Sequence, residues 1–157
     1  FHAFTPTVAN IRPTSRGEIS ISSSDTKVSP KIKMNYLSTD EDRKVAADGI
    51  ELIRKIVMET NEFKKYEPEE FRPGSHLNEK EEIVKACSHY AQTIFHPVGT
   101  CKMGNDESAV VSDKLKVHGI NKLRVIDASI MPNITSGNTN APTIMIAEKG
   151  ADMILSP

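Results

Sequence analysis

The segment His96–Gly104, with the sequence His-Pro-Val-Gly-Thr-Cys-Lys-Met-Gly, constrains the fold of this 157-residue chain more than any other stretch. Pro97 disfavours a helical backbone at the residue before it, so a helix that arrives from the N-terminal side must end before His96. Pro97 and the two glycines then favour a tight, rigid turn. Residues before this segment read as helical, and residues after it are punctuated by Gly, Ser, Asp and Asn.

Apolar residues that recur about every 3.6 positions predict three helices. The first starts at a Ser38–Glu41 capping box and runs to about Glu59, with Gly49 on its apolar side. The second runs from near Asn78 to just before His96. The third opens near Pro142 and spans Thr143 to about Leu155. Its inward positions are expected to be Ile146, Ala147, Gly150, Ala151 and Ile154.

Short runs of alternating or β-branched residues predict strands between these helices. We expect them at residues 8–11, 18–22, 31–34, 115–117 and 123–127. A helical turn is also expected within the charged loop 61–75.

Composition excludes several classes of function. The 20 Lys and Arg residues nearly balance the 21 Asp and Glu residues, and Trp is absent, so nucleic acid is not an expected partner. No apolar run approaches the ~20 residues of a membrane span. Cys87 and Cys101 are expected to be reduced, which agrees with a cytoplasmic location. The chain starts at Phe1 rather than Met, so we expect a fragment of a larger fold.

Three positions could carry chemistry. A rigid His96 suits general acid–base catalysis, although a single histidine is more often structural. Asp127 follows an apolar stretch, where α/β sheets carry ligand-binding groups, but it could equally cap a turn. Residues 137–143 lead into the third helix, whose N-terminus could hold an anion. There the alternative is that Asn138, Thr139 or Asn140 simply caps the helix.

A metal site is the alternative for the sulfur and imidazole groups. Cys87, His89, His96 and Cys101 fall within 15 positions. Structural zinc favours closer ligand pairs, and a two-residue spacing on a helix points side chains to different faces. We therefore expect no metal.

Taken together and in order, these segments resemble the C-terminal region of the glucose–methanol–choline (GMC) oxidoreductases. The motifs that carry the resemblance are Arg12–Gly17, Asn35–Asp42, Thr93–Gly104, Leu123–Pro132 and Ser136–Lys149. They cover nearly the whole chain, and their sequences look closest to those of the bacterial choline-dehydrogenase-like branch.

The resemblance implies an FAD-dependent enzyme that oxidises a small-molecule alcohol by hydride transfer to the flavin. By motif position, His96 is the base that takes the hydroxyl proton, and Asn138 is its partner at the substrate oxygen. The resemblance also implies that Asp127 and Ala128 lie beside the flavin ribityl chain, and that Asn140 and Thr143 lie near the pyrimidine end of the ring.

The resemblance implies a mixed α+β and α/β architecture. Residues 1–90 would form the substrate-binding part, an antiparallel sheet with helices, and 91–104 the active-site junction loop. Residues 105–157 would add the closing strand and helix of the FAD-binding part. No Gly-x-Gly-x-x-Gly fingerprint is present, so the expected partner is an N-terminal FAD-binding portion of the same protein. The alternatives are a non-catalytic module of the same fold and a hydroxynitrile-lyase-like member.

Overall fold

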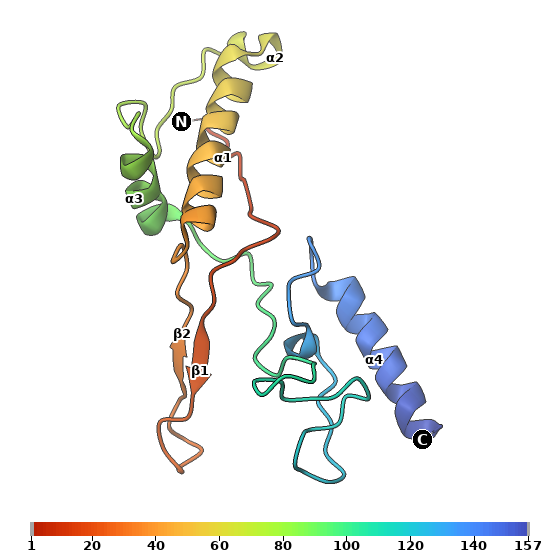
Figure 1. Cartoon of the computed structure of the whole chain (residues 1–157). Coiled ribbons are helices and arrows are strands. Elements are labelled where there is room, and N and C mark those ends of the chain that lie inside the picture. The colour runs from red at the N-terminus through yellow and green to blue at the C-terminus, as the bar shows by residue number, and fades with distance from the viewer. Residues whose placement is uncertain (1, 157) are drawn as a thin grey trace. The chain divides into compact units, whose positions relative to one another are not determined.

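The computed structural model describes residues 2–156, which fall into two compact units (Figure 1). The first unit combines the residues up to Gly17 with Met34–Ile94. The second combines Glu18–Lys33 with the residues from Phe95 onward. No helix in the described part of the chain is both long enough and apolar enough to cross a membrane.

The first unit contains α1 (Asp40–Glu59), α2 (Asn61–Lys64) and α3 (Lys80–Tyr90). The first predicted helix is confirmed, but its cap is wrong by one residue. The Thr39 hydroxyl, rather than Ser38, accepts the backbone N–H of Asp42 at 3.3 Å. The predicted turn after residue 60 is confirmed as α2.

The second predicted helix forms but is shorter than expected. The helix α3 ends at Tyr90, well before His96, because Pro97 sets only an upper limit to its length. It packs against α1, with Ile83 and Ala86 buried.

The N-terminal residues follow an extended path without a strand ladder, so the strand predicted at 8–11 is wrong. Val8 packs on α1 at Gly49 instead, where an added Cβ would lie 2.7 Å from Val8 Cγ1. A close side-chain contact to a helix therefore replaces the expected strand pairing.

A buried carboxylate joins the N-terminal segment to the start of α1. Asp42 is only 5% exposed, and its two oxygens accept hydrogen bonds from Asn10, Thr14 and Ser15 at 2.8–3.1 Å. Burial raises the pKa of Asp42, but the hydrogen bonds from Ser15 and Thr14 outweigh this effect, so the pKa lies below its ordinary value of 3.8.

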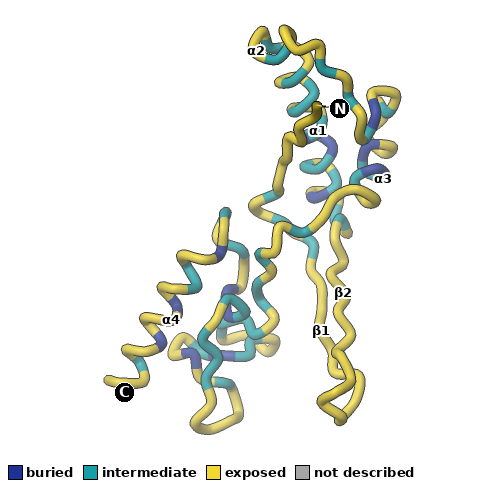
Figure 2. Tube along the Cα trace, turned by 180° about the vertical axis from the view of Figure 1, so that it is seen from behind, coloured by how far each residue is buried: buried dark blue, intermediate teal, exposed yellow. Residues whose placement is uncertain are grey.

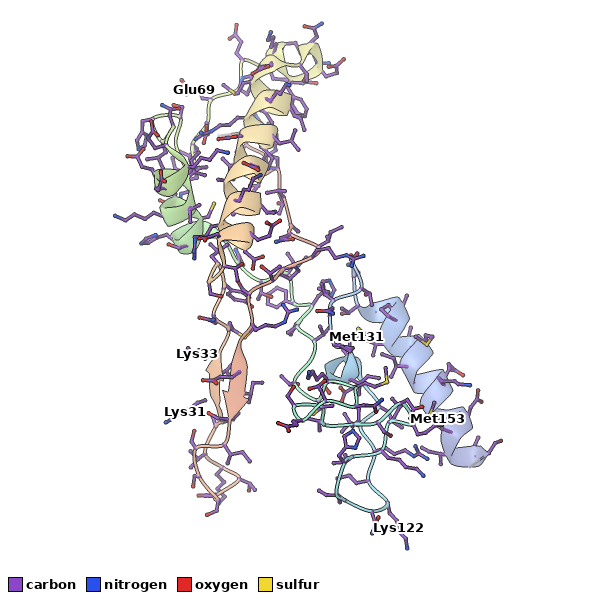
Figure 3. All side chains as sticks on the ribbon, in the orientation of Figure 1. Lys31, Lys33, Glu69, Lys122, Met131 and Met153 are labelled. Carbon is purple, nitrogen blue, oxygen red and sulfur yellow. The ribbon has the colours of Figure 1, made fainter. Side chains whose placement is uncertain are left out.

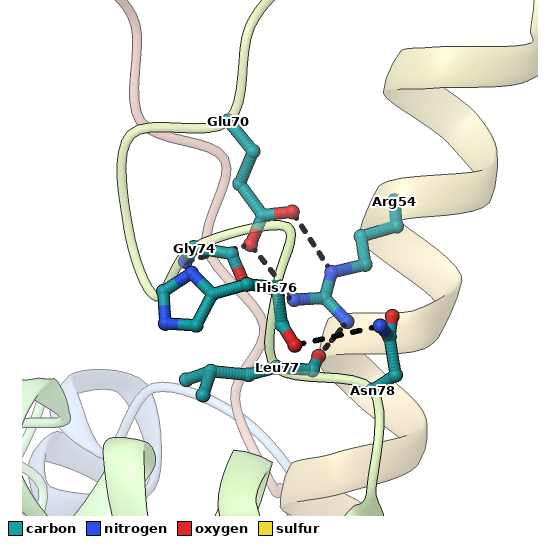
Figure 4. Close-up of polar contacts among 6 residues, drawn as sticks. All are labelled: Arg54, Glu70, Gly74, His76, Leu77 and Asn78. Carbon is teal, nitrogen blue, oxygen red and sulfur yellow. Dashed lines mark hydrogen bonds and ion pairs between the residues drawn. The ribbon is translucent and has the colours of Figure 1, made fainter.

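The loop before α3 is held by an Arg–Glu fork (Figure 4). Arg54 from α1 donates to both Glu70 oxygens at 2.9 and 3.0 Å. The same guanidinium donates to the carbonyls of Leu77 and Gly74 at 2.8 and 3.0 Å. One side chain thus satisfies two backbone carbonyls of an irregular loop.

In the second unit, β1 (Glu18–Ser20) pairs antiparallel with β2 (Lys31–Lys33), and Ile19 lies opposite Ile32. These strands were predicted, although both are shorter than expected. All six residues of the two strands are exposed. A sheet of two strands gains little stability alone in water.

The core of the second unit is built by irregular chain, η1 (Ala128–Ile130) and α4 (Asn140–Leu155). Figure 2 shows buried positions on α4 and on the segments beside it. The buried cluster consists of Val111, Leu115, Ile130, Met131 and Ile146. Met153 of α4 packs partly against it, and Figure 3 labels both Met131 and Met153.

The strands predicted at 115–117 and 123–127 are wrong. These segments form only isolated bridges, Val111 with Val117 and Lys116 with Arg124. An apolar run extends into a strand only where a neighbour offers a continuous ladder, and here each neighbour pairs at a single residue.

The closing helix is confirmed, and it begins earlier than predicted. α4 starts at Asn140, so Pro142 lies in its first turn, where its missing N–H costs nothing. Ile146 and Gly150 are buried as predicted, whereas Ala147, Ala151 and Ile154 are exposed. Helices together with a small antiparallel sheet confirm the predicted mixed fold class.

Candidate active site

The segment 96–104, called here the His96 loop, is held firmly by backbone contacts within the second unit. Cys101 N–H donates to the Ser129 carbonyl at 3.0 Å, and Met103 N–H donates to the Ile130 carbonyl at 2.8 Å. Gly99 has a φ of 91°, and a Cβ there would lie 3.3 Å from the Met131 carbonyl oxygen. The tight turn predicted from Pro97 and the glycines is thereby explained, since a side chain at residue 99 would be strained.

His96 itself is half-buried and fixed by one residue far away in the sequence. Its Nδ1 lies 2.9 Å from the hydroxyl oxygen of Thr139, and the Thr139 backbone N–H donates to the same nitrogen at 3.3 Å. None of the described residues makes a hydrogen bond at Nε2. Nε2 is therefore the ring nitrogen that remains available for a further hydrogen bond.

Thr139 occupies the N-cap position of α4, but its hydroxyl makes no capping bond. The helix also binds the carbonyl of Thr139. Thr143 donates its backbone N–H and its hydroxyl to this oxygen at 3.0 and 2.6 Å. The first turn of α4 also carries no acidic side chain, whereas that of α1 carries three. The partial positive charge at this helix terminus is thus not neutralised by an acidic side chain of its own first turn.

Two predicted site residues, Asn138 and Asn140, flank Thr139 directly and are both exposed. Because His96 contacts Thr139, the His96 loop contacts the residue that lies between these two asparagines in the sequence. Sequence reasoning did not assign Thr139 to the site, because a threonine before a helix is ordinarily a cap. The available signal was its place between two asparagines of the motif.

Asp127 and Ala128 lie at the start of η1. The Asp127 carboxylate accepts the Ser129 backbone N–H at 2.7 Å, so it does act as a cap. Its side chain is exposed, which leaves the carboxylate accessible to a ligand hydroxyl as well. Among the described residues, no hydrogen bond joins Asp127 or Ala128 to His96.

The cysteines and histidines considered as metal ligands do not gather in one place. Cys87 lies on α3 in the first unit and Cys101 lies in the second. Burial raises the pKa of the Cys87 thiol. Across residues 2–156, no three His, Cys, Asp or Glu side chains lie close enough to hold a metal ion.

A family model described as GMC oxidoreductase matches residues 13–147. An oxygen-dependent choline dehydrogenase of Proteus mirabilis is 48% identical over 98% of this chain, and one of Pseudomonas savastanoi is 45% identical over the same share. The chain spans 27% of the length of each of these relatives.

Solved structures agree with the sequence matches. Pyridoxine 4-oxidase from Mesorbium loti superposes with a TM-score of 0.86 at 35% identity, covering 94% of this chain and 28% of that one. A formate oxidase of Aspergillus oryzae, studied for modification of its FAD, superposes with a TM-score of 0.84 at 33% identity. That match covers 98% of this chain and 28% of the oxidase.

Proposed function

Because this chain belongs to the GMC oxidoreductase family, we propose that it supplies the proton-handling part of the active site of an FAD-dependent alcohol oxidoreductase. His96 is the base that takes the hydroxyl proton, and Asn138 is its partner at the substrate oxygen. The observation that carries the proposal is the half-buried His96 ring, held through Nδ1 at the N-terminus of α4 with Nε2 left for a substrate.

The chemistry follows from the two side chains. A neutral imidazole accepts the proton of a substrate hydroxyl, and an amide NH₂ group donates a hydrogen bond to the oxygen as negative charge develops on it. The flavin of FAD, when bound, supplies the acceptor for the hydride that leaves the carbon. His96 and Asn138 thus act on the oxygen of the alcohol, and neither must exchange electrons with it.

The residues at α4 and η1 fit a flavin. The amide N–H groups of the first turn of α4 carry partial positive charge, and no acidic side chain belongs to that turn, which suits the electron-rich pyrimidine end of the ring. Asn140 and Thr143 belong to this turn. The exposed Asp127 offers an acceptor to a hydroxyl of the ribityl chain, and Ala128 beside it leaves room for close approach.

The rest of the cofactor site is proposed to come from an N-terminal FAD-binding portion of the same protein. The chain spans 27% of its curated relatives and carries no glycine fingerprint for a diphosphate. Exposed apolar side chains on α4, namely Ile144, Met145, Ile154 and Leu155, fit a helix face that packs against further protein. Residues 1–90, 91–104 and 105–157 are proposed as the substrate-binding part, the junction loop and the end of the FAD-binding part.

Choline is the first alcohol to test, since the relatives that are 45–48% identical to this chain are choline dehydrogenases. The decisive experiment replaces His96 by Ala in the whole protein and measures the rate of flavin reduction by the alcohol. We expect FAD to remain bound and the rate to fall by about 10²-fold or more. Asn105→Ala, an exposed loop change, is the control and should leave the rate unchanged.

Three other results would each contradict the proposal. A normal rate in the His96→Ala protein would remove His96 from the reaction. A wild-type protein that binds FAD but whose flavin no alcohol reduces would be a non-catalytic module. Substrate cleavage with the flavin oxidised throughout would indicate a lyase of the hydroxynitrile-cleaving type.

A further inference from the structure

The second unit is rich in methionine, and its methionines differ in how far solvent reaches them. Four of the six methionines of the chain lie between residues 103 and 153. Met131 is 5% exposed within the buried cluster, whereas Met145 on α4 is 59% exposed. Met103 and Met153 fall between these extremes, and both pack against the cluster. The thioethers of these two residues are therefore within reach of a small oxidant and at the same time part of a core.

Met103 is the one of the two that belongs to the His96 loop. Its backbone N–H donates to the Ile130 carbonyl at 2.8 Å, and it forms a bridge with Val111, which is fully buried. Met153 instead lies two residues before the end of α4, where fraying of the last turn relieves a local change in packing. A change at the Met103 sulfur therefore acts on the loop that carries His96.

An oxygen atom on the Met103 sulfur would alter the packing of this loop. A thioether is apolar and adapts its shape to its neighbours, whereas a sulfoxide is polar and chiral. The cluster against which Met103 packs consists of apolar side chains. Because burying a polar group in apolar surroundings is unfavourable, we expect the oxidised side chain to leave the cluster and to loosen the loop.

We propose that Met103 is a modification site, at which a peroxide converts the thioether to a sulfoxide and so loosens the His96 loop. In the step, a sulfur lone pair forms the S–O bond and the O–O bond of the peroxide breaks. The proton on the transferred oxygen passes to the departing hydroxide, which leaves as water. The sulfur loses two electrons and the peroxide gains them. An effect on alcohol oxidation rests on the proposed function, whereas the modification and the loosening do not.

The test treats the whole protein, loaded with FAD, with hydrogen peroxide and compares it with three variants. Met103→Leu keeps an apolar side chain of similar volume but has no sulfur. Met145→Leu is the matched control, because it removes a more exposed methionine of the same unit. Cys101→Ala removes a free thiol two residues before Met103, whose oxidation would otherwise be confused with that of the thioether.

Three measurements are made before and after treatment. Peptide mass spectrometry gives the fraction of sulfoxide at each methionine, thermal unfolding gives the stability, and stopped-flow absorbance gives the rate of flavin reduction by the alcohol. The treated protein is then incubated with the two methionine sulfoxide reductases, one for each epimer of the sulfoxide.

We expect sulfoxide at Met103 and Met145, but not at Met131, in the treated wild-type protein. Its thermal midpoint should fall, and flavin reduction should slow by about tenfold, because a small misplacement of a catalytic group is costly. The reductases should restore both. Met103→Leu, compared with its own untreated sample, should keep its midpoint and rate. Met145→Leu and Cys101→Ala should lose them as the wild-type protein does.

An unmodified Met103 in the treated wild-type protein would overturn the inference, and so would a modified Met103 with an unchanged midpoint. These two results decide even if Met103→Leu fails to fold. A Met103→Leu protein as sensitive as wild type, or a loss that the reductases do not reverse, would assign the damage to another residue and overturn the inference as well. An untreated protein whose flavin no alcohol reduces would remove the proposed function but leave the mass and midpoint results standing.

Discussion

The Nδ1 atom of His96 lies 2.9 Å from the hydroxyl oxygen of Thr139, although 43 positions separate the two residues in the sequence. This contact ties the His96 loop to the first turn of α4. It therefore joins two of the five motifs that carry the family resemblance, and both residues of the contact lie within the second unit.

Asn138 precedes Thr139 and should stabilise the developing alkoxide by donating from its amide. We expect Asn138→Ala to slow flavin reduction by about 10²-fold, in the range found when one donor to an oxyanion is removed. Asn138→Asp should be slower still, because a carboxylate cannot donate and repels negative charge. Stopped-flow absorbance of the flavin measures both rates. An Asn138→Ala protein as fast as wild type would exclude this role.

Asp42 should make the stability of the first unit depend on pH. Its pKa is lowered in the folded state, so its contribution is present above the unfolded value and is lost as pH falls through the folded pKa, below 3.8. Asp42→Asn turns one acceptor into a donor that faces backbone N–H groups, which should cost about 1–3 kcal/mol near pH 7.

The measurement is urea unfolding of the whole protein at several pH values, followed by circular dichroism. The stability difference between wild type and Asp42→Asn should shrink as pH falls below 3.8. Asp113→Asn, a change at an exposed carboxylate, should show no such trend. A difference that stays constant with pH would mean that the Asp42 hydrogen bonds do not depend on its charge.

The helices could be predicted because their apolar periodicity is visible in the local sequence. The strands were harder to predict, because a strand forms only where a partner strand pairs with it. The apolar run 123–127 has the composition of a strand, yet Arg124 meets only Lys116 and no ladder follows. Similarly, Thr39 rather than Ser38 caps α1 because its hydroxyl also meets that of Thr14 at 2.6 Å, a contact between distant residues. Contacts between distant residues therefore decide which residue caps a helix and which apolar run forms a strand, and a local sequence pattern does not show these contacts.

The candidate site likewise combines residues that could be predicted from the sequence with one that could not. His96 and Asn138 could be proposed from motif positions alone, and their roles stay predictions. Thr139 could not, because its contact with His96 joins residues 43 positions apart. Asp127 carried two readings in the sequence, and the cap on Ser129 is one of them. Its exposed carboxylate leaves the cofactor reading as a prediction.

Gly150 allows α4 to approach the chain that precedes η1. A Cβ at this position would lie 2.5 Å from Cγ2 of Ile126, so Gly150→Ala should overpack the contact by about 1–3 kcal/mol. The gain of about 1 kcal/mol in helix propensity offsets only part of this. We expect a lower thermal unfolding midpoint by differential scanning fluorimetry. Gly137→Ala, which meets nothing within 4 Å, is the control, and an equal midpoint in both variants would contradict the close packing.

Arg54 should control the order of the loop between α2 and α3. The Arg54 side chain is 20% exposed and that of its partner Glu70 is 13% exposed. Arg54 donates to the carbonyls of Gly74 and Leu77, and Glu70 accepts the Gly74 backbone N–H. Arg54→Ala leaves a poorly solvated carboxylate and free carbonyls, which should cost about 1–3 kcal/mol.

The loss should appear as local opening, because the fork contacts the loop and little else. Phe71 is 74% exposed in this loop, so chymotrypsin cleavage there reports the opening, and we expect faster cleavage in Arg54→Ala. Arg54→Lys keeps the charge but cannot form the two-pronged contact, so its cleavage rate should lie between those of wild type and Arg54→Ala. If Arg54→Lys is cleaved as slowly as wild type, charge alone holds the loop. If Arg54→Ala is cleaved no faster than wild type, the loop is ordered by other contacts.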